Sequence, residues 1–320
     1  MSTSGRTQAR ATPPTTRQAA WDRGAGRLRA LGLAVEEARL EAEVLLRHAA
    51  ALSREELFTR PGAPLGASSA AAYAALIEAR AAGRPTAYLV GRREFFGFEV
   101  LVDERVLIPR PETERLVETV REALAERPAP LIVEIGTGSG AVAIALARLF
   151  PRARAIATDC SATALDVARL NAAHQRVADR ITWAEGGGLD PLAWRGLEGA
   201  VDALVSNPPY IPTRDLADLP REIRDHEPRV ALDGGDDGLA VHRRLVAGAA
   251  RYLRPGGVLA LEVAAVHAQA RAVAGLLAAE GAAFAAPRIV QDYTGAERIV
   301  CAIRGAPSRE GRGDGGNHRG

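Results

Sequence analysis

One apolar run of the chain ends in three alternating glycines: Leu131-Ile132-Val133-Glu134-Ile135-Gly136-Thr137-Gly138-Ser139-Gly140. The run has the length of a buried strand, and the apolar residues that follow, 141–147, have a helical pattern. Glycines permit a tight turn and let a ligand approach the backbone at the amino end of the helix. The stretch therefore predicts a strand, a ligand-binding turn and a helix.

A second apolar run, residues 155–158, ends at Asp159. This acid follows the glycines by about twenty residues, the spacing at which a carboxylate accepts hydrogen bonds from ribose hydroxyls. It could equally be a turn residue, because Ser161 is suited to cap a helix predicted over residues 162–173.

A third apolar run, residues 201–206, is followed directly by Asn207-Pro208-Pro209-Tyr210. Prolines donate no backbone N–H, so they end the strand and leave rigid carbonyls beyond its carboxyl end, where open α/β sheets bind ligands. An Asn amide, two fixed carbonyls and an aromatic face could hold a planar NH₂ group. Taken alone, the tetrapeptide fits an ordinary proline-rich turn as well.

A nicotinamide dinucleotide is the first cofactor to consider, and the spacing disfavours it. The glycines alternate, whereas the dinucleotide fingerprint is G-x-G-x-x-G. Glu134, two residues before the first glycine, suits an amino or sulfonium cation better than a pyrophosphate. Together, the glycine turn, Asp159 and the Asn-Pro-Pro-Tyr turn resemble an S-adenosylmethionine-dependent amino-methyltransferase.

Further motifs resemble those of one family, and this resemblance covers roughly residues 21–304. An ordered set of motifs is similar to that of the peptide chain release factor glutamine methyltransferases (the PrmC/HemK family): Arg84-Pro85-Thr86-Ala87-Tyr88, Ile108-Pro109-Arg110-Pro111-Glu112-Thr113-Glu114, Asn207-Pro208-Pro209-Tyr210 and Glu227-Pro228-Arg229. Adenine methyltransferases share the Asn-Pro-Pro-Tyr motif, so the specificity lies in its combination with the upstream motif.

The resemblance implies a fold and an activity. The fold is α/β: a doubly wound, seven-stranded class I S-adenosylmethionine-dependent methyltransferase sheet, with a small N-terminal helical domain joined by a β-hairpin. The activity is methyl transfer from S-adenosyl-L-methionine to the side-chain amide nitrogen of the glutamine in the Gly-Gly-Gln motif of class I release factors, in the cytoplasm.

The resemblance also implies roles for particular residues. It implies that the substrate glutamine is bound and positioned by Asn207, Pro208, Pro209 and Tyr210, with Tyr210 packing on the amide. It implies that the cofactor is bound by the glycine turn and by residues at two strand ends: Gly136, Thr137, Gly138, Ser139, Gly140, Asp159 and Asn207. We expect Arg110, Glu112 and Glu114 to support the structure more than to contact the cofactor.

The chain departs from the family at two places. The family usually has Asp and an aromatic residue near the adenine where this chain has Gly187 and Gly188, so we expect weaker cofactor affinity. In Glu262-Val263-Ala264, alanine stands where a glycine is usual.

Composition restricts the partners. The chain has 320 residues and a net charge of +2, and all 41 basic residues are arginine. This balance gives no basic footprint for nucleic acid, and no run is long enough to span a membrane. Cys160 and Cys301 have no metal-ligand spacing, so we expect no metal, and we expect Cys160 to be a small packing residue.

The pattern along the chain predicts five segments. They are a disordered head (1–20), a helical substrate-docking domain (21–84), a β-hairpin linker (85–110), a methyltransferase domain (111–304) and a disordered tail (305–320). The methyltransferase domain should close with an antiparallel pair of strands over residues 286–303.

Three other functions stay open. A sister activity would methylate a glutamine of a large-subunit ribosomal protein with the same chemistry. An adenine-specific DNA methyltransferase would need a basic groove, which the near-neutral charge disfavours. A non-catalytic remnant would fit the altered Gly187-Gly188 segment, although the other motifs are intact.

Overall fold

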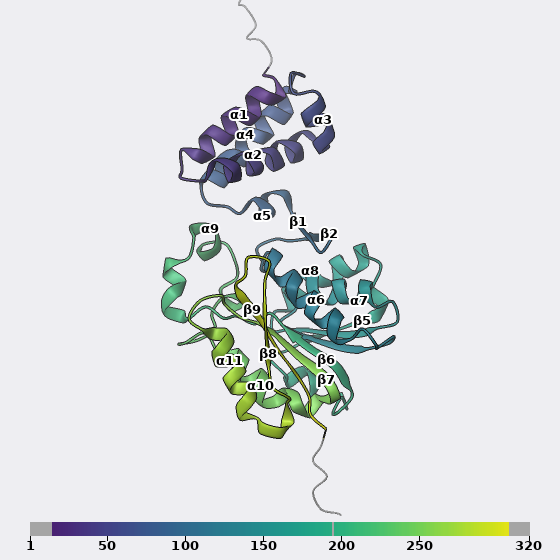
Figure 1. Cartoon of the computed structure of the whole chain (residues 1–320). Coiled ribbons are helices and arrows are strands. Elements are labelled where there is room, and N and C mark those ends of the chain that lie inside the picture. The colour runs from purple at the N-terminus through teal and green to yellow at the C-terminus, as the bar shows by residue number, and fades with distance from the viewer. Residues whose placement is uncertain (1–14, 194, 307–320) are drawn as a thin grey trace, which may run out of the picture. The chain divides into compact units, whose positions relative to one another are not determined.

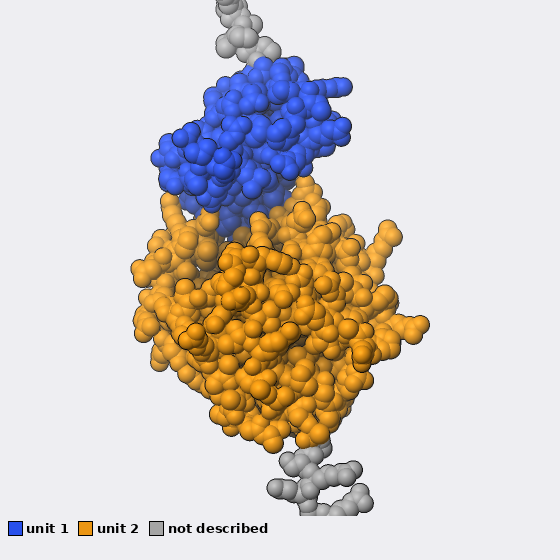
Figure 2. All heavy atoms as spheres, in the orientation of Figure 1, with its two compact units in different colours: residues 1–91 blue, residues 92–320 orange. Residues whose placement is uncertain are grey.

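The computed structural model of the protein describes residues 15–193 and 195–306. The chain forms two compact units, residues 1–91 and residues 92–320 (Figure 2). The predicted tail beyond residue 306 and most of the predicted head lie outside the described residues. No helix among the described residues has the length and apolar character needed to cross a membrane.

The first unit is helical. Its helices are α1 (Arg17–Arg29), α2 (Val35–Ala50), α3 (Arg54–Thr59), α4 (Ala67–Ala81) and α5 (Thr86–Val90). They enclose a core that includes Trp21, Leu28 and Leu45. Helix α1 begins inside the segment predicted to be an unstructured head, because the Thr16 hydroxyl accepts a hydrogen bond from Ala19 N–H and caps the helix.

The second unit begins with the predicted hairpin, β1 (Arg92–Phe95) and β2 (Phe98–Leu101), paired antiparallel. The Glu114 carboxylate accepts a hydrogen bond from Phe96 N–H (2.8 Å), and Asn171 bonds both Leu101 N–H (2.7 Å) and Leu101 C=O (3.0 Å). Through these contacts the hairpin is part of the second unit.

Seven strands of the described residues form one mixed sheet in the order β5-β4-β3-β6-β7-β9-β8. The strands are β3 (Leu131–Ile135), β4 (Arg154–Asp159), β5 (Ile181–Glu185), β6 (Val201–Ser206), β7 (Leu253–Glu262), β8 (Arg288–Gln291) and β9 (Glu297–Ile303). Strands β3 to β7 pair in parallel, whereas β9 runs antiparallel to β7 and β8. The predicted doubly wound sheet with a closing antiparallel pair is confirmed.

Helices cover both faces of the sheet (Figure 1). One face carries α6 (Glu114–Ala123), α7 (Ala141–Leu149) and α8 (Ala162–His174), and the other carries α10 (Ala240–Tyr252) and α11 (Gln269–Ala279). A short helix, α9 (Arg221–Arg224), lies in the long connection after β6. Because helices bury both faces of the sheet, the strands carry apolar residues on both faces. Leu204 of β6, for example, is fully buried.

The strand order reverses between β3 and β6. From β3 the chain moves outward through β4 and β5, and it then returns to the other side of β3 as β6. Ile135 and Ser206 are register partners at the carboxyl ends of these strands, and the Ser206 hydroxyl donates to Ile135 C=O (2.7 Å). Such a switch point opens a crevice in doubly wound folds, so two of the sequence motifs begin on either side of it.

Candidate active site

A cavity of about 390 Å³ lies at this switch point. It is lined by the glycine turn, the end of β4 and the residues that follow β6. The segment after the β1–β2 hairpin and the loop after Glu227 complete the lining. Its lining includes Val106, Pro109, Arg110, Thr113, Gly136, Thr137, Gly138, Ser139, Asp159, Gly186, Gly187, Gly188, Asn207, Pro208, Pro209, Pro228 and Val230. The structure thus gathers residues from distant segments around one enclosed space.

The glycine turn has the conformation that its sequence predicts. Gly136 (φ 73°) and Gly138 (φ 54°) have left-handed backbones, and a β-carbon at either position would meet no atom within 4 Å. These two glycines are therefore required by conformation. Gly140 (φ 82°) is left-handed as well, and in addition its β-carbon would lie 3.1 Å from the Ala168 Cβ, so it also serves the close packing of α7 on α8. Gly140 is not among the described residues that line the cavity.

The side chain of Glu134, near the end of β3, holds this turn through hydrogen bonds. Its Oε2 accepts hydrogen bonds from the Thr137 hydroxyl (2.6 Å) and from Ala143 N–H at the start of α7 (2.9 Å). Burial raises the pKa of Glu134 to about 8, while these two hydrogen bonds oppose the rise and Asp159 adds to it. Glu134 therefore holds the turn, and it also lines the cavity.

Asp159 joins the ends of two strands. Its Oδ2 accepts a hydrogen bond from Gly138 N–H (2.8 Å), and its Oδ1 accepts one from Ser161 N–H (2.9 Å). The Ser161 hydroxyl in turn accepts from Ala164 N–H, so the predicted cap of α8 is confirmed. Cys160, expected to be a small packing residue, is exposed and lines the cavity.

Three of the four residues of the tetrapeptide after β6 line the cavity. Asn207, Pro208 and Pro209 line the cavity, and Asn207 Nδ2 donates to the Thr113 hydroxyl (3.2 Å). Tyr210 is not among the described lining residues. Its hydroxyl lies 3.5 Å from Glu262 Oε1, and burial raises its pKa. Packing of the half-buried Tyr210 ring on a substrate amide stays a prediction.

The motif around Arg110 is largely structural. Arg110 Nη2 pairs with Glu227 Oε1 (2.6 Å), and Glu114 holds the hairpin through Phe96 N–H. Thr113, within the same motif, contacts Asn207, a role that was not predicted. Its position between Glu112 and Glu114 is the only signal of this role in the sequence.

Gly187 and Gly188 also line the cavity. A β-carbon at either residue would meet no atom within 4 Å, so the space that an Asp and an aromatic residue would fill is open. Trp183, an aromatic residue of the preceding strand β5, is not among the described lining residues, and Trp194 lies outside the described residues.

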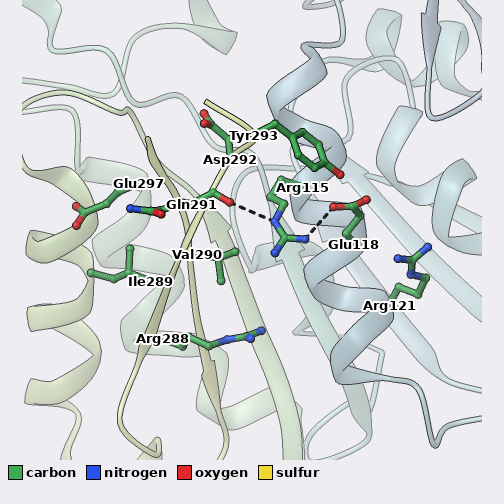
Figure 3. Close-up of a pocket in the computed structure, with 10 residues that line it drawn as sticks. All are labelled: Arg115, Glu118, Arg121, Arg288, Ile289, Val290, Gln291, Asp292, Tyr293 and Glu297. Carbon is green, nitrogen blue, oxygen red and sulfur yellow. Dashed lines mark hydrogen bonds and ion pairs between the residues drawn. The ribbon is translucent and has the colours of Figure 1, made fainter. Parts of the chain in front are cut away.

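A second depression, of about 710 Å³, lies along α6 and β8 (Figure 3). Figure 3 shows Arg115 of α6 directed at Glu118 (2.8 Å) and at Gln291 C=O (3.2 Å). None of its lining residues comes from the glycine turn or the tetrapeptide. The enclosed cavity at the switch point is therefore the better candidate for an active site.

Fold and site together define a class I methyltransferase. A family described as a methyltransferase domain matches residues 132–226, and one described as PrmC N-terminal domain matches residues 19–91. The hMettl16 catalytic domain, 14% identical with a TM-score of 0.55, covers 69% of this chain and 81% of its own and shares the fold.

Curated relatives specify the family. The release factor glutamine methyltransferase of Moorella thermoacetica is 47% identical over 84% of this chain and 93% of its own length. The release factor glutamine methyltransferase of Chlorobaculum tepidum is 42% identical over 82% of this chain and 90% of its own length. The chain belongs to the release factor glutamine methyltransferase family.

Proposed function

We propose that this protein transfers a methyl group from S-adenosyl-L-methionine to the side-chain amide nitrogen of the glutamine in the Gly-Gly-Gln motif of class I release factors. One observation carries the proposal within this family: residues 136–139 of the glycine turn, Asp159 and the first three residues of the tetrapeptide, Asn207, Pro208 and Pro209, line one cavity at the switch point. The reaction would take place in the cytoplasm, during translation termination.

The cavity has groups that fit S-adenosylmethionine. The left-handed backbones of Gly136 and Gly138 let a ligand approach the turn, and the Asp159 carboxylate offers acceptor sites for ribose hydroxyls. Each carboxylate oxygen has two lone pairs, and each Asp159 oxygen uses one on the backbone. When bound, S-adenosylmethionine supplies an electrophilic methyl group on its sulfonium.

Asn207 is the group suited to hold the target amide. Because its Nδ2 is committed to Thr113, its Oδ1 is the atom that can accept an N–H from a glutamine side chain. The Pro208 carbonyl is the second proposed acceptor, and Pro208 and Pro209 fix the turn that presents both. Two acceptors would hold both amide hydrogens and direct one face of the nitrogen.

An amide nitrogen is a weak nucleophile because its lone pair is delocalised into the carbonyl. The proposed site compensates by positioning and by excluding water, since a fixed near-attack geometry lowers the barrier without a strong base. Hydrogen bonds from the amide to Asn207 and Pro208 would also place electron density on the nitrogen. The methyl–sulfur bond breaks as the methyl–nitrogen bond forms, S-adenosylhomocysteine leaves, and the methylated amide loses one proton to solvent.

The competing substrate is a glutamine of a large-subunit ribosomal protein. The catalytic groups would be the same, so the choice depends on the helical first unit. That unit matches the PrmC N-terminal domain over residues 19–91, which favours a release factor.

The test is mass spectrometry of a class I release factor incubated with the protein and S-adenosylmethionine. We expect one added methyl group on the Gly-Gly-Gln glutamine, lost with Asn207→Ala. A release factor with glutamate in place of that glutamine is the matched substrate control. Methylation of a ribosomal-protein glutamine, with none on the release factor, would overturn the proposed substrate.

A further inference from the structure

Gln269 is a buried amide that contacts the turn of the proposed glutamine site. It is the first residue of α11, has an exposed fraction of 2%, and lies 59 residues from Tyr210 in the chain. Its Nε2 donates a hydrogen bond to Tyr210 C=O (2.7 Å), and its Oε1 accepts one from Ala264 N–H (3.0 Å). Because one partner is an acceptor and the other a donor, together they fix which way the amide faces.

The apolar surroundings of this amide show what its polar atoms are for. Val273 and Leu277 follow at helical spacing on the same face of α11, and both are fully buried in the core of the second unit. An apolar side chain would suit such a face, and a buried amide costs free energy unless it is hydrogen-bonded. Gln269 meets this condition through two backbone groups, so the role of its side chain is to hold them.

Two glycines of the loop before α10 pack on the same part of the turn. A β-carbon at Gly238 would lie 2.3 Å from the Tyr210 carbonyl oxygen and 2.5 Å from Gln269 Nε2. One at Gly234 would lie 2.8 Å from the Pro209 carbonyl oxygen. Gly238 is also left-handed (φ 77°), so glycine is required there by both space and conformation. The carbonyls of Pro209 and Tyr210 therefore lie against this loop, with Gln269 beside them.

We propose that Gln269 is a positioning residue that fixes the Tyr210 end of the tetrapeptide and thereby the placement of Asn207 and Pro208. The proposal rests on the proposed function, in which Asn207 Oδ1 and the Pro208 carbonyl accept the N–H groups of the substrate glutamine. Because the two prolines have fixed φ angles, the tetrapeptide is stiff, and a shift at one end moves the other.

The turn is then held at both of its ends. At the first end, the Ser206 hydroxyl donates to Ile135 C=O (2.7 Å), and Asn207 Nδ2 donates to the Thr113 hydroxyl (3.2 Å). At the second end, Gln269 supplies the corresponding side-chain contact. Without it the turn would be free to shift, and a displacement of about 1 Å in a near-attack geometry costs roughly 100-fold in rate.

Two substitutions separate the two contacts of Gln269. Gln269→Met removes both hydrogen bonds with little change in length, whereas Gln269→Glu keeps an acceptor for Ala264 N–H and places an oxygen against Tyr210 C=O. We expect both to lower kcat/KM for the release factor roughly 10–100-fold, the cost of a displaced group. S-adenosylhomocysteine should bind as in wild type, because Gln269 is not among the described residues that line the cavity.

The glutamate variant adds a rescue by protonation. A protonated carboxyl has an O–H that can donate to Tyr210 C=O, so the loss relative to wild type should shrink between about pH 9 and about pH 6. A side chain that only fills space would give no such recovery. Wild-type activity of Gln269→Glu at every pH, with Gln269→Met impaired, would assign the effect to Ala264 and overturn the proposal. If Gln269→Met does not fold, Gln269→Glu decides.

Val273→Ala is the matched control for a structural role. Val273 lies one turn further along the same face of α11 and is fully buried, so its truncation leaves a cavity and lowers the melting temperature. Because Val273 is not among the described residues that line the cavity, kcat/KM should stay at the wild-type value. A loss of kcat/KM in Gln269→Met no greater than that in Val273→Ala would overturn the proposal.

A labelled peptide bond reports the contact without any activity. Of the five tyrosines, Tyr210 alone precedes an isoleucine. Carbonyl carbon-13 tyrosine and nitrogen-15 isoleucine therefore give one coupled signal, from Tyr210 C=O and Ile211 N–H. We expect the carbonyl resonance to move upfield in Gln269→Met, because the carbonyl loses its hydrogen-bond donor, and to stay in place in Val273→Ala.

Nitrogen-15 labelling of asparagine reports the far end of the turn. The chain has three asparagines, Asn171, Asn207 and Asn317. We expect the Asn207 side-chain amide signal to shift in Gln269→Met but not in Val273→Ala. Asn171 Nδ2 is held by two backbone carbonyls, at 3.0 and 2.9 Å, so its signal is the internal control and should not change.

These readouts separate the two proposals. A wild-type protein that leaves the release factor unmethylated refutes the proposed function, and the Tyr210 and Asn207 signals still decide whether Gln269 positions the turn. An Asn207 signal that is the same in wild type and in Gln269→Met refutes the positioning role, even where the Tyr210 carbonyl resonance moves.

Discussion

Arg110 and Glu227 form an ion pair between two walls of the cavity, with Arg110 Nη2 lying 2.6 Å from Glu227 Oε1. The Glu227 side chain is 1% exposed and that of Arg110 28%. Glu227 Oε2 also accepts a hydrogen bond from Ile108 N–H (3.3 Å). The pair joins the segment after the hairpin to the loop that begins at Pro228, and both line the cavity.

Removing the arginine should therefore loosen both walls. Arg110→Met leaves a buried carboxyl without its cation, and we expect the free energy of unfolding to fall by about 1–3 kcal/mol, less than for a fully buried pair because Arg110 is partly exposed. Urea denaturation measures this change. Adding Glu227→Gln should restore part of the loss; a single variant as stable as wild type would show that the pair contributes little.

Asp159 should contribute directly to cofactor affinity. Asp159→Ala removes the proposed ribose acceptor and the bond to Gly138 N–H, so we expect S-adenosylhomocysteine to bind about 10–100-fold more weakly. Asp159→Asn, which keeps one acceptor, should lose less. Asp166→Ala is the matched control, because Asp166 pairs only with Arg169 on the surface of α8 among the described residues. Calorimetry decides, and equal affinity in Asp159→Ala and Asp166→Ala would contradict the assignment.

The sequence predicted the local parts of the site. The glycine turn, Asp159 and the Asn207 tetrapeptide each follow an apolar strand directly, so the end of each strand places them. The closing antiparallel strands were predictable for the same reason, because their pattern is local.

The contacts between these parts were not predictable. Thr113 lies 94 residues from Asn207 in the chain, and Glu262 lies 52 residues from Tyr210. Such pairs depend on the strand order, which brings β7 beside β6. The motif around Tyr210 predicts an aromatic face for the substrate, but it gives no sign that the Tyr210 hydroxyl lies 3.5 Å from Glu262 Oε1.

Glu134 should make stability depend on pH. Its pKa is about 8 in the folded protein, above the ordinary value of 4.5. Between these values the folded state keeps a proton that the unfolded state loses, so stability falls as pH rises. Glu134→Gln should remove this dependence. We expect the wild-type free energy of unfolding, relative to the variant, to decline by up to about 1.4 kcal/mol per pH unit between about pH 5 and 8.

Denaturation of both proteins at several pH values measures this difference. Other groups that titrate in the window, such as His242, whose pKa burial lowers, are common to both proteins and cancel. A difference that stays constant with pH would mean that Glu134 is ionised in the folded state.

Gly187 offers a test of the expected weak cofactor affinity. Its backbone is not left-handed, and a β-carbon there would meet no atom within 4 Å, so the residue can become aspartate without strain. Because Gly187 lines the cavity, Gly187→Asp would restore the acceptor that the family usually places near the adenine. We expect S-adenosylhomocysteine to bind about three- to tenfold more tightly, the value of one hydrogen bond.

Two controls make this prediction specific. Gly187→Ala fills the same space without an acceptor and should bind like wild type. The purine riboside analogue of S-adenosylhomocysteine carries hydrogen in place of the adenine amino group, so it has no N–H to give the new carboxylate and should gain nothing. Calorimetry with both ligands tests whether the amino group is the partner. An equal gain for both would mean that the aspartate acts through general electrostatics, and no gain for either would place the adenine away from Gly187.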